Sequence, residues 1–287
     1  MIYRKIDCLD HGFVRLVDKM GDDSSIVQAA RVSYGDGTKS AQEDNELINY
    51  LLRHRHTTPF EMVEFKFHIK MPIFVMRQWI RHRTANVNEY SARYSIMKKE
   101  FYIPKPEDLA VQSTRNKQGR EDIKLDDIQA NAIISILQGD ADQCYEDYEY
   151  MLNDPESENY DTERASLARE LSRMNLPVNI YTECYWKIDL HNLLHFLGLR
   201  MDSHAQYEIR VFANAIYDII KEYVPVACNA FIEYRLNAMT LSHKEILWIN
   251  RMVTTSTNYV TNEKPDNFSK GEWIETKNKL KKLGLIN

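Results

Sequence analysis

Two segments in which apolar and polar residues alternate constrain the fold more than any other feature of this sequence. The first covers residues 63–71 and the second covers residues 178–188. Successive side chains of a β-strand point to opposite faces, so each segment predicts a strand with one apolar and one polar face. Pro72 ends the first strand and favours a helix directly after it, up to Arg81 or Arg83. The apolar positions of the first strand are Val63, Phe65, Phe67, Ile69 and Met71.

Helix signals surround these two strands. Residues 126–152 predict one long helix, or two helices that break near Gly139, and residues 162–174 predict a helix that Pro177 stops. Residues 2–20 predict a strand-like segment, residues 23–30 a helix capped by Asp23, and the capping box of Ser40 with Glu43 a helix after it. Two later helices are expected, one from Asp189 as cap to Arg200 and one at 204–223 capped by Asp202 or Ser203. Two more follow the capping boxes of Ser242 with Glu245 and of Ser269 with Glu272, and Gly284 closes the last one.

These elements predict an α+β fold: a single helix-rich domain with a twisted, largely antiparallel sheet flanked by helices. We expect residues 1–287 to form this one domain. Residues 104–124 contain two prolines, a glycine and many charges, and we interpret them as a polar surface excursion. Residues 238–287 are expected to form a helical C-terminal extension, which either covers the core or packs on another subunit.

Composition narrows the functional classes. The chain has 37 basic and 42 acidic residues, a net charge of -5, so general nucleic-acid binding is not expected. The cysteines form no CxxC pair, which indicates neither a zinc site nor a disulfide framework. The first residues lack an apolar signal core and no apolar run reaches the roughly 20 residues that cross a bilayer, so we expect a soluble, cytoplasmic protein without a membrane partner. The four cysteines are Cys8, Cys144, Cys184 and Cys228.

The region from residue 56 to residue 94 is unusually rich in side chains that can bind ligands or take part in catalysis. Together with two later arginines it places five guanidinium groups where loops or helix ends are expected, and such groups bind phosphate or carboxylate oxygens in a bidentate way. In a helix Arg81 and Arg83 would point to roughly opposite sides and serve two partners. In an extended loop Glu89, Ser91 and Arg93 would share one edge. The five arginines are Arg81, Arg83, Arg93, Arg173 and Arg200.

Simpler interpretations compete with these. Each arginine can be a solvated or ion-paired surface residue, and Arg200 can merely complement a helix C-terminus. Thr58 also fits a plain turn cap. The histidines His54, His56 and His82 could ligate a metal, but the arginines between them oppose cation binding, so no metal is expected. Asp202, Ser203 and His204 resemble a helix cap more than a catalytic triad, and Ser91 lacks the Gly-x-Ser-x-Gly setting of a hydrolase nucleophile.

The segment Arg81-His82-Arg83, followed after seven residues by Ser91, resembles the signature of the flavin-dependent thymidylate synthases. The resemblance covers roughly residues 24–223, with one departure at Asn86, where many members have Ser. It extends through HTTPFE (56–61), MPIFVMRQWIRHR (71–83), ARELSR (168–173) and LRMDSHAQYE (199–208).

The resemblance implies that the chain makes dTMP from dUMP. Methylene-tetrahydrofolate would be the one-carbon donor, and FAD would relay a hydride from NADPH. A homotetramer with active sites shared between subunits is implied as well. The implied dUMP-binding residues are Gln78, Trp79, Ile80, Arg81, Glu89, Tyr90, Ser91, Ala92, Arg93, Arg173 and Arg200. The implied flavin-binding residues are Thr58, Arg81, His82, Arg83, Glu89, Asp189, His191 and His195.

Three residues are implied to take part in the chemistry. Arg200 would lie against the uracil ring, and a fixed cation there favours the anionic, electron-rich form of the ring. His56 would lie near the flavin ring and the folate or nicotinamide site. Ser91 is either a nucleophile or a dUMP ligand, and a ligand is favoured because no general base is evident beside it. None of the four cysteines lies in a motif for attack on the pyrimidine.

Two other classes of function stay open on the residues alone. A module that binds single-stranded RNA or nucleotides could use the same arginines and stack bases on Trp79, Tyr90 and Tyr94. A flavoprotein of another activity, such as a reductase that uses NADPH, would need the flavin contacts but not Arg93, Arg173 or Arg200.

Overall fold

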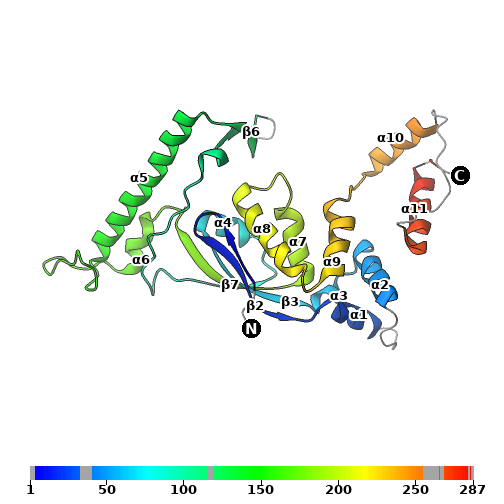
Figure 1. Ribbon diagram of the computed structural model, residues 1–287, viewed down its shortest axis with the longest axis horizontal. Helices are drawn as coiled ribbons and strands as arrows, with labels where there is room; N and C mark the ends of the chain where they lie inside the picture. The colour runs from blue at the N-terminus through cyan, green and yellow to red at the C-terminus, as the bar shows by residue number, and fades with distance from the viewer. Residues whose placement is uncertain are drawn as a thin grey trace.

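The computed structural model describes residues 4–32, 41–114, 119–254, 265, 268–283 and 285 (Figure 1). Its centre is a five-stranded sheet of order β1-β2-β3-β7-β4, in which every neighbouring pair is antiparallel. The predicted combination of helices with a largely antiparallel sheet is therefore confirmed. The strands are β1 (Lys5–Cys8), β2 (Gly12–Met20), β3 (Glu64–Pro72), β4 (Asn86–Glu89) and β7 (Tyr181–Asp189), and a separate pair is formed by β5 (Ala110–Gln112) and β6 (Arg120–Lys124).

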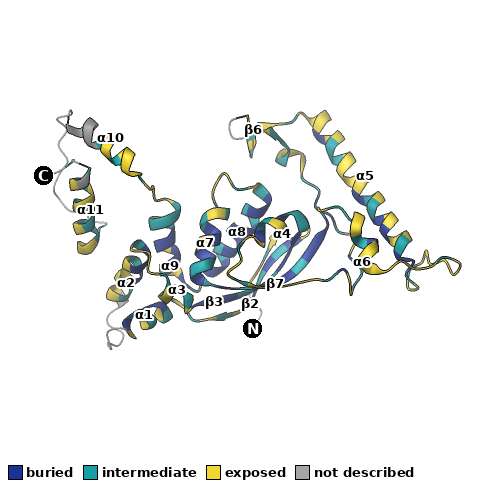
Figure 2. Cartoon of the chain, turned by 180° about the vertical axis from the view of Figure 1, so that it is seen from behind, coloured by how far each residue is buried: buried dark blue, intermediate teal, exposed yellow. Residues whose placement is uncertain are grey.

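The apolar faces of β3 and β7 form the centre of the core. Phe65, Phe67 and Ile69 of β3 are fully buried, and Trp186 and Ile188 of β7 are nearly so. The helices α4 (Ile73–Trp79), α7 (Leu190–Arg200) and α8 (Tyr207–Ile220) pack on this face, where Figure 2 shows the buried residues gathered. The alternation of residues 63–71 thus predicted the right strand.

The opposite face of the sheet is polar. Nδ1 of His68 in β3 accepts from Nη2 of Arg15 at 2.6 Å, and Nε2 donates to the carboxylate of Glu183 at 2.8 Å. The ring of His68 stacks on Tyr185 at 4.9 Å. The predicted second strand begins at Tyr181 rather than at residue 178, because the backbone before it pairs with the start of α4 and with Phe101 instead.

Eleven α-helices fall within the described residues, and the outer ones lie at opposite ends of the sheet (Figure 1). None of the described helices is both long and apolar enough to span a membrane. Besides the three above they are α1 (Asp23–Arg31), α2 (Ala41–Arg53), α3 (Thr58–Glu61), α5 (Asp127–Leu152), α6 (Arg169–Ser172), α9 (Pro225–Phe231), α10 (His243–Thr254) and α11 (Lys270–Lys282), with short 3-10 helices η2 (Pro106–Asp108) and η3 (Arg173–Asn175) and a π-helical segment η4 (Ile232–Leu236).

Three of the predicted caps are confirmed. Asp189 caps α7, with its Oδ1 accepting from the backbone N–H of Asn192 at 2.9 Å. The capping boxes of Ser242 and Ser269 are both present. The long helix α5 runs unbroken through Gly139. The cap of α1 is Asp22 instead of Asp23, and the predicted positions Ser40 and Gly284 lie outside the described residues.

Two predicted helices were wrong in extent. Residues 162–168 are irregular because Asn153, at φ 44°, binds the backbone of Asp161 and Arg164 with its side-chain amide, and such local bonds compete with helix formation. Residues 204–206 precede α8, whose N-cap is Gln206 and not the predicted Asp202 or Ser203. The Asp202 carboxylate instead accepts from the backbone N–H of His204 and forms a turn.

The helix after β3 also ends earlier than predicted. It closes at Trp79 with Ile80 as its C-cap, so Arg81 and Arg83 lie in the turn beyond it and not on opposite helix faces. The predicted extended edge of Glu89, Ser91 and Arg93 breaks too, because the chain turns after β4. The backbone carbonyl of Ser91 accepts from the N–H groups of residues 94 and 95.

Candidate active site

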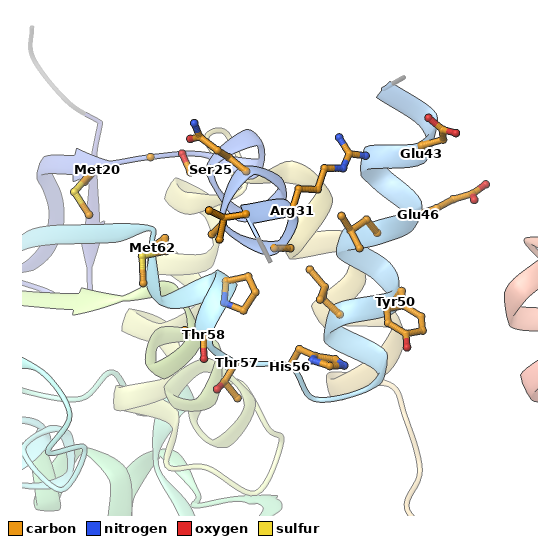
Figure 3. Close-up of a pocket in the computed structure, with 18 residues that line it drawn as sticks. Met20, Ser25, Arg31, Glu43, Glu46, Tyr50, His56, Thr57, Thr58 and Met62 are labelled. Atoms are coloured by element: carbon orange, nitrogen blue, oxygen red, sulfur yellow. The ribbon is translucent and has the colours of Figure 1, made fainter. Parts of the chain in front are cut away.

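The first group of predicted site residues lines a cavity of about 1490 Å³ between α1, α2 and α3 (Figure 3). His56 and Thr58 both lie on its wall, next to Thr57 and Tyr50. We call it the His56 cavity; besides these four residues it is bounded by Met20, Met62 and parts of α1 and α2, including Glu43 and Glu46.

The turn from α2 to α3 places His56 in this cavity. Arg55 adopts a left-handed backbone with φ 62°, and the N–H of His56 donates to the carbonyl of Leu51 at 2.9 Å. A bulky residue in this region is uncommon and is kept only where its surroundings hold it. The N-cap of α3 is Thr57, without a side-chain cap bond, so Thr58 is not the turn cap that we considered as an alternative.

The second group surrounds Arg200 at the end of α7, and we call it the Arg200 cluster: Gln78, His82, His195 and Arg200. The Nε of Arg200 donates to Nε2 of His82 at 3.1 Å, and its Nη2 donates to the carbonyl of Gln78 at 3.4 Å. The rings of His82 and His195 lie 6.0 Å apart. Because Nε2 of His82 accepts, its ring is neutral and carries its proton on Nδ1.

Electrostatics in the Arg200 cluster agree with this protonation. Burial, followed by the Arg200 charge and His195, lowers the pKa of His82 to about 4. Burial also lowers the pKa of Arg200, although a guanidinium stays charged at physiological pH. The cluster thus contains one fixed cation that a neutral imidazole orients.

The third group is the turn that follows β4. Glu89 accepts from the hydroxyl of Thr182 at 2.9 Å, and Tyr90 donates from its hydroxyl to the carbonyl of Ile96 at 2.8 Å. Arg93 lies 3.4 Å from the carboxylate of Glu170 on α6, and both side chains are more than half exposed. Arg173 follows α6 directly, on η3. The ion pair therefore holds Arg93 against Glu170 of α6, three residues before Arg173 in the chain.

The remaining predicted residues fall into exposed and buried sets. Arg81, Arg83 and Ile80 are exposed beside the Arg200 cluster. The ring of Trp79 is 1% exposed and packs against Trp186 and Phe196 in the core. Ala92 is buried as well. A buried Trp79 cannot stack on a base, which removes one of the aromatic residues on which the RNA-binding alternative depends.

Comparison with known proteins gives the family. The family model described as "Thymidylate synthase complementing protein" matches residues 15–226 of this chain. The chain belongs to that family. Among the curated relatives, the flavin-dependent thymidylate synthase of Rickettsia bellii is 55% identical over 282 residues, 98% of this chain and 95% of the relative. The enzyme of the same name from Gluconobacter oxydans is 55% identical over 275 residues, 96% of this chain and 87% of that relative.

Solved structures agree with this assignment to the family. The UMP/dUMP methylase PolB of Streptomyces cacaoi, bound with 5-Br dUMP, superposes with a TM-score of 0.69 at 30% identity, covering 80% of this chain and 99% of PolB. The same methylase bound with 5-Br UMP gives 0.70 at 29% identity, with 82% and 99% covered. The resemblance seen in the sequence motif is therefore confirmed at the level of the family.

Three of the four cysteines do not have the properties of nucleophiles. Cys8, Cys184 and Cys228 are buried, and burial raises the pKa of each thiol to about 12. The reactive form of cysteine is the thiolate, so these thiols are inert at neutral pH. Among the described residues, no group of three or more His, Cys, Asp or Glu side chains is arranged to hold a metal ion.

Three contacts of the site were missed by sequence reasoning. The side chains of Gln206 and Gln78 are hydrogen-bonded, Glu170 pairs with Arg93, and Glu275 of α11 binds the end of α2 next to the His56 cavity. Gln206 and Glu170 lie inside segments that match the family, and that match was the signal available for them. Glu275 lies outside those segments and carried none.

Proposed function

We propose that the chain catalyses the reductive methylation of dUMP to dTMP, with methylene-tetrahydrofolate as one-carbon donor and tetrahydrofolate as product. The hydride would come from NADPH by way of FAD. The names of the curated relatives and the dUMP analogue bound to the solved neighbour support this reaction. The observation that carries it is the half-buried Arg200 guanidinium, held by a neutral His82 and the Gln78 carbonyl.

Arg200 would act on the uracil ring. Two of its N–H groups have partners among the described residues, so the rest of the fork can donate to a ring carbonyl and imide. In a site shielded from water, such a cation stabilises the ring anion and makes carbon 5 a better nucleophile toward the one-carbon unit. The side-chain amide of Gln78 gives one N–H to Gln206 and would donate the other to the same ring edge.

Arg93 and Arg173 would bind the dUMP phosphate. The ion pair of Arg93 with Glu170 is largely exposed, and such pairs contribute little stability, so a phosphate dianion can replace the carboxylate as partner. Ser91 would be a ligand and not a nucleophile. Its hydroxyl accepts from the backbone N–H of Arg93, and within the described part of the chain no histidine or carboxylate is hydrogen-bonded to it.

The exposed guanidinium groups of Arg81 and Arg83 fit the pyrophosphate of FAD, because two cations without an ion pair among the described residues can neutralise two phosphate charges. When bound, FAD supplies the hydride, which no side chain can. Five residues would orient it: His82, Glu89, Asp189, His191 and His195. The Asp189 carboxylate also caps α7, where it accepts from the backbone N–H and the side-chain amide of Asn192. Thr58 and His56 would hold the flavin edge and the folate or nicotinamide in the His56 cavity.

We also propose that the active unit is a homotetramer. In one chain the proposed residues lie in three groups: the His56 cavity, the Arg200 cluster and the turn after β4. Surfaces of neighbouring subunits would complete each site around the exposed arginines. The substrates are metabolites of nucleotide synthesis, so we place the enzyme in the cytoplasm.

The test is product formation by the purified, FAD-loaded chain. Incubated with dUMP, methylene-tetrahydrofolate and NADPH, it should form dTMP, which chromatography detects, and omission of NADPH should abolish it. NADPH oxidation without dTMP, by protein shown to be folded, would instead support a reductase of different activity.

A further inference from the structure

We propose that Glu275, in the C-terminal helix α11, is a positioning residue that fixes the turn carrying His56. This inference rests on the role proposed above for His56 at the flavin and folate or nicotinamide site. It assigns a function to α11, which lies more than two hundred residues after α2 in the chain.

The contact between Glu275 and α2 is a bidentate one. Nε of Arg53 donates to Oε2 of Glu275 at 2.5 Å, and Nη2 donates to Oε1 at 3.0 Å. Nε2 of His54 adds a third bond, at 2.9 Å to Oε1. The side chain of Arg53 is only 12% exposed and that of Glu275 23% exposed, so water competes little for this pair. Bidentate pairs of this kind fix geometry as well as adding energy.

The residues that Glu275 holds lead directly into His56. Arg53 is the last residue of α2 and His54 the next, and they are followed by the left-handed Arg55 and then by His56. The ring of Tyr50 lies 4.3 Å from that of His54, tilted by 38°, and 6.0 Å from that of His56, so Tyr50 links His54 to His56 on the cavity wall. A shift of His54 therefore moves His56.

The helix α11 is itself anchored on η4. Glu272, one turn before Glu275, is hydrogen-bonded to the hydroxyl of Tyr234, and the Arg53 guanidinium lies 5.3 Å from the centre of the Tyr234 ring. Arg235 donates to the carbonyl of Leu52 at 2.9 Å. The end of α2 is thus held between η4 and α11. Glu275 is the nearer of two carboxylates that face Arg53, since that of Glu272 lies 3.8 Å away.

The charge on Glu275 is present throughout the working pH range. Its hydrogen bond with Arg53, and then that with His54, lower the pKa of this carboxyl to about 2. The left-handed backbone of Arg55 needs such support, because arginine rarely adopts this conformation unless its surroundings hold it. The helix α11 therefore acts on the site by positioning the turn that carries His56, and not by contact with a ligand.

The experiment compares Glu275→Ala with Lys279→Ala, an exposed residue on the same helix. Amide hydrogen exchange of residues 54–58 is measured first, because it needs no activity. Loss of a bidentate charged contact should raise exchange at these amides by about tenfold in Glu275→Ala, with exchange in α7 unchanged. Glu275→Gln, which keeps the side-chain volume, replaces Glu275→Ala if that variant does not fold.

The second readout separates positioning from a general loss of folded protein. The KM for methylene-tetrahydrofolate should rise about tenfold in Glu275→Ala while dUMP affinity stays within about twofold, since the proposed dUMP residues lie elsewhere. Exchange and KM equal to those of Lys279→Ala would overturn the proposal, as would a fall in kcat with both KM values unchanged. If the wild-type chain makes no dTMP, the proposed function fails, and the exchange data alone decide the role of Glu275.

Discussion

The neutral His82 beside Arg200 predicts a specific pH dependence of stability. In the folded chain burial and the neighbouring charge lower the pKa of His82 to about 4, from 6.5 for a free side chain. Between these two values the unfolded chain binds more protons than the folded chain, so stability falls as the pH falls through this window. The loss is complete below pH 4 and absent above pH 6.5.

The magnitude follows from the displacement of the pKa. One pH unit corresponds to about 1.4 kcal/mol, so the full displacement is worth about 3 kcal/mol. His82 is only half-buried, and solvent screening reduces the expected effect to about 1–2 kcal/mol. This amount is a sizeable fraction of the net stability of a typical domain.

The assay is urea unfolding of the wild type and of His82→Gln at a series of pH values from neutral to 4. Carboxylates and the other histidines titrate in both proteins, so the difference between the two curves of unfolding free energy against pH isolates His82. The wild type should lose about 1–2 kcal/mol more than His82→Gln between pH 6.5 and 4. His243→Gln, which alters an exposed histidine of α10, should follow the wild type. Parallel curves for His82→Gln and the wild type would refute the neutral, buried assignment.

Three further predictions concern the proposed site and the core. Arg200→Lys should lower kcat/KM for dUMP by about a hundredfold in steady-state assays, because an ammonium cannot reproduce the guanidinium fork; unchanged kinetics would contradict its placement at the ring. Single Cys→Ala variants at Cys8, Cys184 and Cys228 should leave kcat largely intact, and complete loss in any one would revive a thiol nucleophile. Trp79→Ala should lower the free energy of unfolding by about 3–5 kcal/mol in urea titrations, since its ring fills the core; a loss below about 1 kcal/mol would contradict that packing.

The strands and long helices could be predicted from the sequence because their signals are local. The alternation of residues 63–71 and the cap at Asp189 each depend on a few neighbouring residues, and both were confirmed. The helix predicted at 162–174 forms only from Arg169 onward, because Asn153, outside that window, holds the backbone before it in a loop. The helical periodicity of residues 162–174 gives no sign of such a competing side-chain hydrogen bond.

The candidate site could be predicted as a set of residues but not as an arrangement. The motif and its matches pointed to Arg200 and His82, yet these lie 118 positions apart and their contact depends on how α7 packs beside α4. The ion pair of Glu275 with Arg53 spans 222 positions and carries no spacing signal. Contacts of this kind are set by tertiary packing, which residue patterns within a window do not encode.

The most direct measurement is release of tritium from dUMP labelled at carbon 5, followed together with dTMP formation. Wild-type chain supplied with FAD, NADPH and methylene-tetrahydrofolate should release tritium in step with dTMP, and Arg200→Lys should lose both in parallel. Folded wild-type protein that releases no tritium and forms no dTMP under these conditions would contradict the proposal that Arg200 activates the uracil ring for methylation.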